Sequence, residues 1–211
     1  DVYAPNATKK GIDVSEHNSN IDWEKVKAAG IDYAIIRCGY GDNYDNQDDK
    51  QWLRNVSECE RLGIPYGVYI YSYAQSTDMA TSEAQHVLRL ISGHKLSYPV
   101  YFDMEDNSTL GSDFGAIAQT FCSTVQNAGY AVGVYANLNW WNKYLTDTRF
   151  EQWHRWVAQY NIQCDYTGKR VLLVEDNDLN SEIAKEIIGM TGAEVVTAEN
   201  GKTAVDMISS G

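Results

Sequence analysis

The segment Tyr98-Pro-Val-Tyr-Phe-Asp-Met-Glu-Asp106 is a short apolar run that ends in three acidic side chains. Buried parallel strands have such continuous apolar sequences, and the residues that follow them lie at the carboxyl edge of the sheet. A second apolar run that ends in acidic residues, with a different sequence, is Arg170-Val-Leu-Leu-Val-Glu-Asp-Asn177. The chain therefore joins two sequence types at a seam near Lys169 and Arg170.

Apolar runs of this kind recur along the chain and alternate with helical patterns. Most helical patterns end at a glycine, which adopts the left-handed conformation at little cost, and these glycines recur every 24 to 39 residues. This spacing indicates one βα unit per period. The expected strands span about residues 10–16, 32–39, 65–74, 98–104, 130–136, 155–160, 170–175 and 194–198.

Eight alternating βα units most simply close into a (β/α)8 barrel of the α/β class. We predict this fold, with residues 1–211 forming a single unit. The alternative is an incomplete barrel followed by a separate small α/β piece. We favour the single barrel because six parallel strands leave two unpaired edges, and two strands with two helices make a poor independent core.

Composition excludes several classes of partner. The net charge is −12, of which residues 170–211 contribute −5 (three Lys/Arg against eight Asp/Glu) and the rest contributes −7. With both parts acidic and no basic stripe, we expect no binding to nucleic acid or to anionic membranes. No apolar stretch approaches 18 residues, and the four cysteines lack metal-ligand spacing, so we expect no membrane span and mostly free thiols. We expect a monomer.

The best candidate for chemistry is the pair Asp103 and Glu105. Two residues apart on a strand, they point to the same face with Cα atoms about 6.6 Å apart. Asp13 follows the first strand, and the carboxyl ends of barrel strands form the active-site mouth. Paired carboxylates at this distance suit glycosidic hydrolysis, although the spacing does not choose between retaining and inverting outcomes. A structural pair of acids is the alternative.

Aromatic and polar residues follow the other strands at the same expected rim. Aromatic faces cover the apolar side of a sugar ring while polar groups bind its hydroxyls, so this setting favours a sugar site. Core packing is the alternative for any single aromatic residue. The candidate substrate contacts are His17, Tyr69, Tyr71, Asn137, Trp140, Gln159 and Tyr160, with Tyr73 and Trp141 beside them.

Seven segments together resemble glycoside hydrolase family 25. They are Lys10-Gly-Ile-Asp-Val-Ser-Glu16, Ile21-Asp-Trp-Glu-Lys-Val-Lys-Ala-Ala-Gly30, Ala34-Ile-Ile-Arg37, Gly63-Ile-Pro-Tyr-Gly-Val-Tyr69, Pro99-Val-Tyr-Phe-Asp-Met-Glu-Asp106, Gly133-Val-Tyr-Ala-Asn137 and Trp156-Val-Ala-Gln-Tyr160. The resemblance covers about residues 8–168. It implies a modified (β/α)8 barrel and a secreted lysozyme of the muramidase type, which acts without a cofactor on peptidoglycan glycan strands.

By the same resemblance Glu105 is the general acid, and Asp103 and Asp13 are supporting carboxylates, with Asp103 assisting the intermediate. One departure matters. The family's last two strands usually carry a Trp-Gln-Tyr segment and then a strand ending in an Asp followed by Asn. Neither segment is present here, and Glu199 and Asn200 are the only local candidates to replace that Asp.

Residues 170–211 instead resemble the first half of a response-regulator receiver, which has a flavodoxin-like fold. In that family an acidic pair helps to hold Mg²⁺, and Glu175 and Asp176 match it, as weak metal candidates at most. The sequence ends at Gly211, before the phospho-accepting Asp, so we expect no phosphorelay function.

We interpret the chain as an engineered chimera. In this interpretation residues 1–169 form the family 25-like segment, and residues 170–211 supply a βαβα segment that rebuilds the last two barrel units. The function we expect is a muramidase with reduced activity. The alternative is a catalytically inactive chimeric barrel that retains at most glycan binding. The cellular location of such a chimera stays open.

Overall fold

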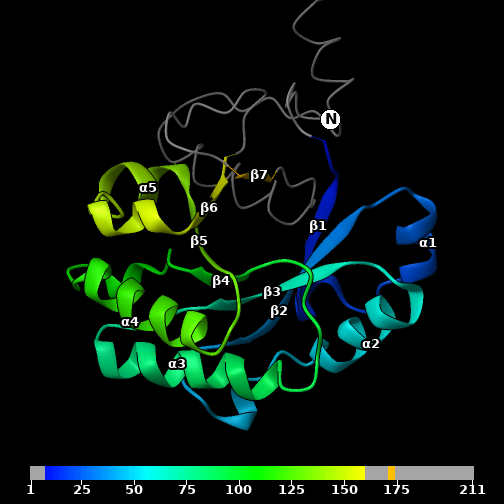
Figure 1. The fold of residues 1–211 in the computed structure, drawn as a ribbon, viewed down its shortest axis with the longest axis horizontal. Coiled ribbons are helices and arrows are strands. Elements are labelled where there is room, and N and C mark those ends of the chain that lie inside the picture. The colour runs from blue at the N-terminus through cyan, green and yellow to red at the C-terminus, as the bar shows by residue number, and fades with distance from the viewer. Residues whose placement is uncertain (1–7, 160–170, 174–211) are drawn as a thin grey trace, which may run out of the picture.

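The computed structural model describes residues 8–159 and 171–173, which form a curled, all-parallel sheet flanked by helices (Figure 1). The strands are β1 (Gly11–Val14), β2 (Tyr33–Tyr40), β3 (Tyr66–Tyr71), β4 (Val100–Asp103), β5 (Val132–Asn137), β6 (His154–Ala158) and β7 (Val171–Leu173). The helices are α1 (Trp23–Ala28), α2 (Trp52–Leu62), α3 (Thr77–Leu90), α4 (Phe114–Asn127) and α5 (Leu138–Lys143). Short 3-10 turns are η1 (Glu16–Asn18), η2 (Asp45–Gln47), η3 (Asn107–Thr109) and η4 (Thr148–Gln152).

Within the described residues the strands lie in chain order, from β1 to β7, and every neighbouring pair is parallel. The α/β class and the first six strands expected from the sequence are therefore confirmed, as a curled half-barrel. The seventh expected strand appears as β7, which pairs with β6 from Trp156 opposite Val171 to Ala158 opposite Leu173. The eighth, at 194–198, lies outside the described residues.

The outer face of the sheet packs against the helices. Val68, Ile70, Val100 and Phe102 belong to a large buried cluster that includes the apolar stripes of α2, α3 and α4. The Phe102 ring stacks on Phe121 of α4 with centroids 3.9 Å apart. These are the stripes with helical spacing in the sequence, and their burial fixes which face of each strand points outward.

The helix ends follow ordinary capping chemistry. Asp22 caps α1 and accepts a hydrogen bond from the backbone N–H of Lys25 at 3.1 Å. Gly63 ends α2 with a φ of 67°, a left-handed conformation that glycine adopts most easily. No helix in the described part of the chain is long and apolar enough to cross a membrane.

The inner face of the sheet carries a second, aromatic cluster. Ile35, Tyr101 and Trp156 form its buried centre, with further tyrosines packed around them. The space for these rings comes from a glycine on a neighbouring strand, since a Cβ at Gly133 would lie 2.6 Å from the Tyr101 ring. This inner layer is the floor on which the polar residues at the carboxyl ends of the strands stand.

Three of the four cysteines lie in the described part of the chain. Cys38, Cys59 and Cys122 are buried free thiols, as expected from the sequence. Burial raises the pKa of the Cys59 thiol to about 12, so it stays protonated and unreactive near neutral pH.

Candidate active site

Asp103 is the last residue of β4, one inner-face position beyond Tyr101. It pairs in register with Tyr71 on one side and Tyr135 on the other, and only 4% of it is exposed. Its Oδ1 atom accepts no hydrogen bond from the described residues. A buried carboxylate without full hydrogen bonding is costly to ionise, so this position favours the protonated acid.

The charges around Asp103 act in the same direction. Burial raises its pKa well above the ordinary value, and the negative charges of Glu105 and Asp13 raise it further. Arg37 opposes them. These influences place Asp13, from β1, at the same mouth as the two carboxylates that follow β4.

Glu105 is held by the end of the next strand. Its Oε2 atom accepts hydrogen bonds from the backbone N–H of Asn137 at 2.7 Å and from the Asn137 side-chain amide at 3.0 Å. The Asn137 Oδ1 atom accepts from the backbone N–H of Trp140 at 3.1 Å and so caps α5. One side chain thus starts a helix and fixes the orientation of Glu105. The structure gives Asn137, a candidate substrate contact, a positioning task as well.

The tyrosines of β3 line the mouth next to the acids. The Tyr71 hydroxyl donates to Asp106 Oδ2 at 3.0 Å, and its ring lies edge-on to Tyr73 at 5.2 Å. Tyr69 lies edge-on to Trp156 at 6.2 Å. Burial first, and then the negative charge of Asp13 for Tyr69 and of Asp103 for Tyr71, raises the pKa of both phenols. Both phenols therefore remain neutral hydrogen-bonding groups.

A hollow of about 300 Å³ opens beside these acids, on the side of the mouth formed by β1, β2 and β3. It is lined by Glu16, His17, Arg37, Tyr40, Tyr71 and Tyr73. The exposed His17 stands at its edge, with Nε2 3.4 Å from Nη1 of Arg37. Aromatic walls with a few polar groups are the surroundings in which proteins bind sugar rings.

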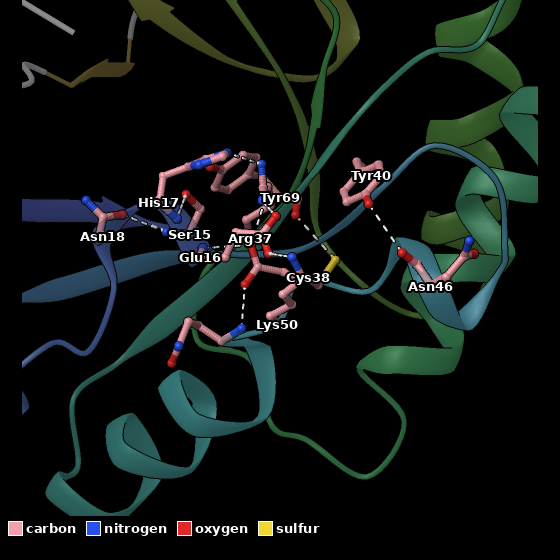
Figure 2. A network of polar contacts seen from close by, with 12 residues as sticks. Ser15, Glu16, His17, Asn18, Arg37, Cys38, Tyr40, Asn46, Lys50 and Tyr69 are labelled. Carbon is pink, nitrogen blue, oxygen red and sulfur yellow. Dashed lines mark hydrogen bonds and ion pairs between the residues drawn. The ribbon is translucent and has the colours of Figure 1, made fainter. Parts of the chain in front are cut away.

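Arg37 is a residue of this site that the sequence reasoning did not select. It lies on β2, is 8% exposed, and binds Asp49 through Nε at 2.7 Å and Glu16 through Nη2 at 2.9 Å. Figure 2 shows Glu16, His17 and Tyr69 gathered around it. The available signal was a single cation inside an otherwise apolar strand, because a buried charge requires a partner.

The comparisons with known proteins fit this arrangement. The family model described as glycosyl hydrolases family 25 matches residues 12–175. The chain belongs to glycoside hydrolase family 25. The match extends through β7 and past the seam near Arg170. A fused receiver or a chimera is not shown by any of the comparisons.

The relatives are named as lysozymes. The autolytic lysozyme of Clostridium acetobutylicum is 29% identical over 167 residues, covering 75% of this chain and 49% of the relative. Lysozyme M1 of Streptomyces globisporus is 27% identical over 145 residues, covering 63% of this chain and 48% of the relative. The chain spans about half the length of these curated relatives.

Among solved structures, the modular autolysin LytC of Streptococcus pneumoniae is 33% identical, with a TM-score of 0.67. The match covers 75% of this chain and 39% of LytC. LytC has also been solved in complex with a synthetic peptidoglycan ligand.

Some candidate residues do not join the group at the mouth. Trp140 is 3% exposed and packs in the core against Phe114, at 5.4 Å, and Tyr144, at 5.0 Å. Trp141 is equally buried and donates from Nε1 to the carbonyl oxygen of Trp156 at 3.2 Å. The cap at Asn137 starts α5 at once, and this turns both indoles into the protein.

Gln159 directly follows β6 and is half-buried. The remaining candidates, Tyr160, Glu175, Asp176, Glu199 and Asn200, lie outside the described residues. Across residues 8–159 and 171–173, no group of three or more His, Cys, Asp and Glu side chains has the geometry to hold a metal ion.

Proposed function

We propose that this family 25 chain is a peptidoglycan-hydrolysing lysozyme that cleaves the β-1,4 bond after N-acetylmuramic acid. The observation that carries the proposal is the acidic group at the end of β4, where Glu105 is fixed by Asn137 beside the buried Asp103. The lysozyme names of the relatives and the peptidoglycan complex of LytC support the choice of substrate.

In the proposed reaction Glu105 donates its proton to the glycosidic oxygen as the C1–O bond breaks. Water then adds to C1, and the proton that it loses passes to a carboxylate at the mouth. The two hydrogen bonds from Asn137 to Oε2 fix the orientation in which Glu105 presents its carboxyl group to the glycosidic oxygen. Asp103, assisted by Asp13, supports the positive charge that develops on the cleaved sugar. The tyrosines of β3, with His17, bind the glycan along the hollow.

The proposal extends to the rest of the barrel. Residues 170–211, of receiver-like sequence, supply the last two βα units in place of the family's own, as in an engineered chimera of segments 1–169 and 170–211. The parallel pairing of β7 with β6 supports this. Because the Asp that usually follows the last strand is missing, we expect reduced turnover and better-preserved glycan binding. We further propose that the protein is monomeric and acts outside the cell, without a metal.

The test of function is lysis of bacterial cell walls, followed as loss of turbidity. Replacing Glu105 by Gln removes the acid while keeping its size, so the rate should fall about 10²–10⁴-fold. Glu151→Gln, at an exposed position of η4, is the matched control and should lyse walls like the parent chain. Equal rates for Glu105→Gln and the parent would refute the proposed acid.

The test of the completed barrel is a chain cut after Gly168. The cut removes β7 and leaves the edge of β6 unpaired, because β6 is bonded on that side only to β7 among the described strands. We expect aggregation or loss of tertiary structure, measured by near-UV circular dichroism and by size-exclusion chromatography. A soluble 1–168 fragment that unfolds cooperatively would contradict the proposal.

A further inference from the structure

Arg37 is the only Lys or Arg buried in the described part of the chain. A buried cation is tolerated only when its charge and its N–H groups are matched, and Arg37 has two carboxylate partners. The Asp49 side chain is itself fully buried, so the pair is fixed in one geometry. Such an arrangement costs free energy of desolvation, so stability alone does not account for it.

The partners of Arg37 tie three segments of the chain together at the mouth. Asp49 Oδ2 accepts from Arg37 Nε at 2.7 Å and from the backbone N–H of Glu16 at 2.9 Å. Asp49 Oδ1 accepts from the backbone N–H of Gln51 at 2.8 Å, at the start of α2. The loop after β1 is therefore fastened to β2 and to the entry of α2.

The fastened loop starts just beyond Asp13. The side chain of Ser15 accepts from the backbone N–H of His17 at 3.3 Å, and the backbone N–H of Ser15 donates to Asn18 at 2.8 Å. These bonds close the η1 turn, which follows the strand that carries Asp13. Fixing Glu16 consequently fixes the end of β1 on which Asp13 lies, together with His17 at the edge of the hollow.

Arg37 also acts electrostatically on the acids at the mouth. The groups acting on Asp103 are Glu105 and Asp106 after β4, Asp13 from β1 and Arg37 from β2. From β3, the neutral Tyr69 and Tyr71 face the same carboxyl group. Arg37 is the one cation in this set, so it alone favours the ionised form of Asp103 against burial and three carboxylates.

We propose that Arg37, held by Asp49 and Glu16, is a positioning residue that fastens the Asp13 loop at the mouth and balances the negative charge of the catalytic acids. This inference rests on the proposed function, because it concerns the same site. Its consequence is that Asp103 can ionise, and so support positive charge on the sugar, at a lower pH than burial alone would allow.

The direct test is a pH titration of the Asp103 carboxyl carbon by ¹³C NMR, assigned by loss of the signal in Asp103→Asn. Arg37→Met would leave Asp49 buried without its cation and could unfold the protein, so the double variant Arg37→Met/Asp49→Asn removes both charges together. In this variant the midpoint of the titration should rise by about one pH unit or more. Arg61→Met removes an exposed arginine of α2 and should leave the midpoint unchanged.

Activity gives a second readout that a purely structural role would not move. In the double variant Asp103 should ionise only at a higher pH. The acid limb of its pH–rate profile on soluble glycan fragments should therefore move to higher pH by the same amount as the NMR midpoint. Arg37→Lys keeps the charge but cannot bind both carboxylates in the same geometry, so the acid limb should return to the parent position while KM rises above that of the parent.

An unchanged NMR midpoint in the double variant would overturn the inference, whether or not the parent chain lyses walls. A parent chain that fails to lyse walls, with the midpoint shifted as expected, would instead count against the proposed function alone. A shifted midpoint accompanied by an unshifted acid limb would overturn the link from Arg37 to the reaction.

Discussion

The two sides of the mouth differ in the hydrogen bonds and charges that surround their buried acids. On the Arg37 side, formed by Glu16, Arg37 and Asp49, the buried carboxylate accepts three hydrogen bonds and faces a cation. On the Asp103 side, formed by Asp103, Glu105 and Asn137, Asp103 is as deeply buried but has an oxygen that accepts no bond from the described residues. The Arg37 side holds ionised groups in a fixed ion pair, and the Asp103 side favours the protonated form of its acid.

An Asp→Asn substitution should change the free energy of unfolding in opposite directions on the two sides. Asp49→Asn leaves Arg37 buried without its closest anion, and the free energy of unfolding should fall by about 3 kcal/mol. Asp103→Asn removes an acid that is costly to ionise, so the free energy of unfolding at pH 8 should rise while wall lysis falls about 100-fold. Urea unfolding and turbidity assays on both variants measure the contrast.

The raised pKa of Asp103 determines how its contribution to stability changes with pH. The folded protein binds this proton more tightly than the unfolded chain, so stability is lost as pH rises above the ordinary value of 3.8. At pH 4 the Asn variant should therefore gain little stability. A destabilised Asp103→Asn protein at pH 8 would show that the two sides do not differ in this way.

Glu83 of α3 sharpens the comparison, because it is fully buried and accepts a hydrogen bond at each carboxyl oxygen. It accepts from the Ser72 hydroxyl at 2.6 Å and from the backbone N–H of Tyr73 at 2.8 Å, and so holds the chain after β3 at the rim of the hollow. Burial nevertheless raises its pKa from 4.5 to about 7, so these two bonds only partly offset the loss of solvation.

Glu83 binds its proton more tightly in the folded state than in the unfolded chain. Its contribution to stability is therefore present below pH 4.5 and is lost as pH rises to about 7. The free energy of unfolding of the parent chain should fall by about 2 kcal/mol more between pH 5 and pH 8 than that of Glu83→Gln. Urea unfolding at both pH values gives this difference. Identical slopes with pH in the two proteins would contradict the burial effect.

Much of the fold follows from local patterns in the sequence. Glycines after helical stripes and short apolar runs predict the order of elements, because each βα unit is specified by its own stretch of sequence. The strand limits differ by a few residues, as in 98–104 against Val100–Asp103, because pairing with neighbours determines where a strand ends. The eighth strand, the closure of the barrel and the receiver-like helices lie outside the described residues and remain predictions.

The site was only partly predictable. The i, i+2 spacing placed Asp103 and Glu105 together because strand geometry is local. The Arg37 side was missed because its partners, Glu16 and Asp49, come from different loops and meet only in the folded chain. Trp140 was selected as a rim aromatic, and sequence alone could not reveal that the Asn137 cap turns it into the core.

The central claim is that Glu105 is the acid of a muramidase. Purified peptidoglycan is digested, the new reducing ends are converted with borohydride, and the reduced sugars are identified by mass spectrometry. The parent chain and Glu151→Gln should both yield reduced N-acetylmuramic acid, and Glu105→Gln should yield about 100-fold less or lower still. Equal yields from Glu105→Gln, or new ends on N-acetylglucosamine in place of N-acetylmuramic acid, would contradict the account.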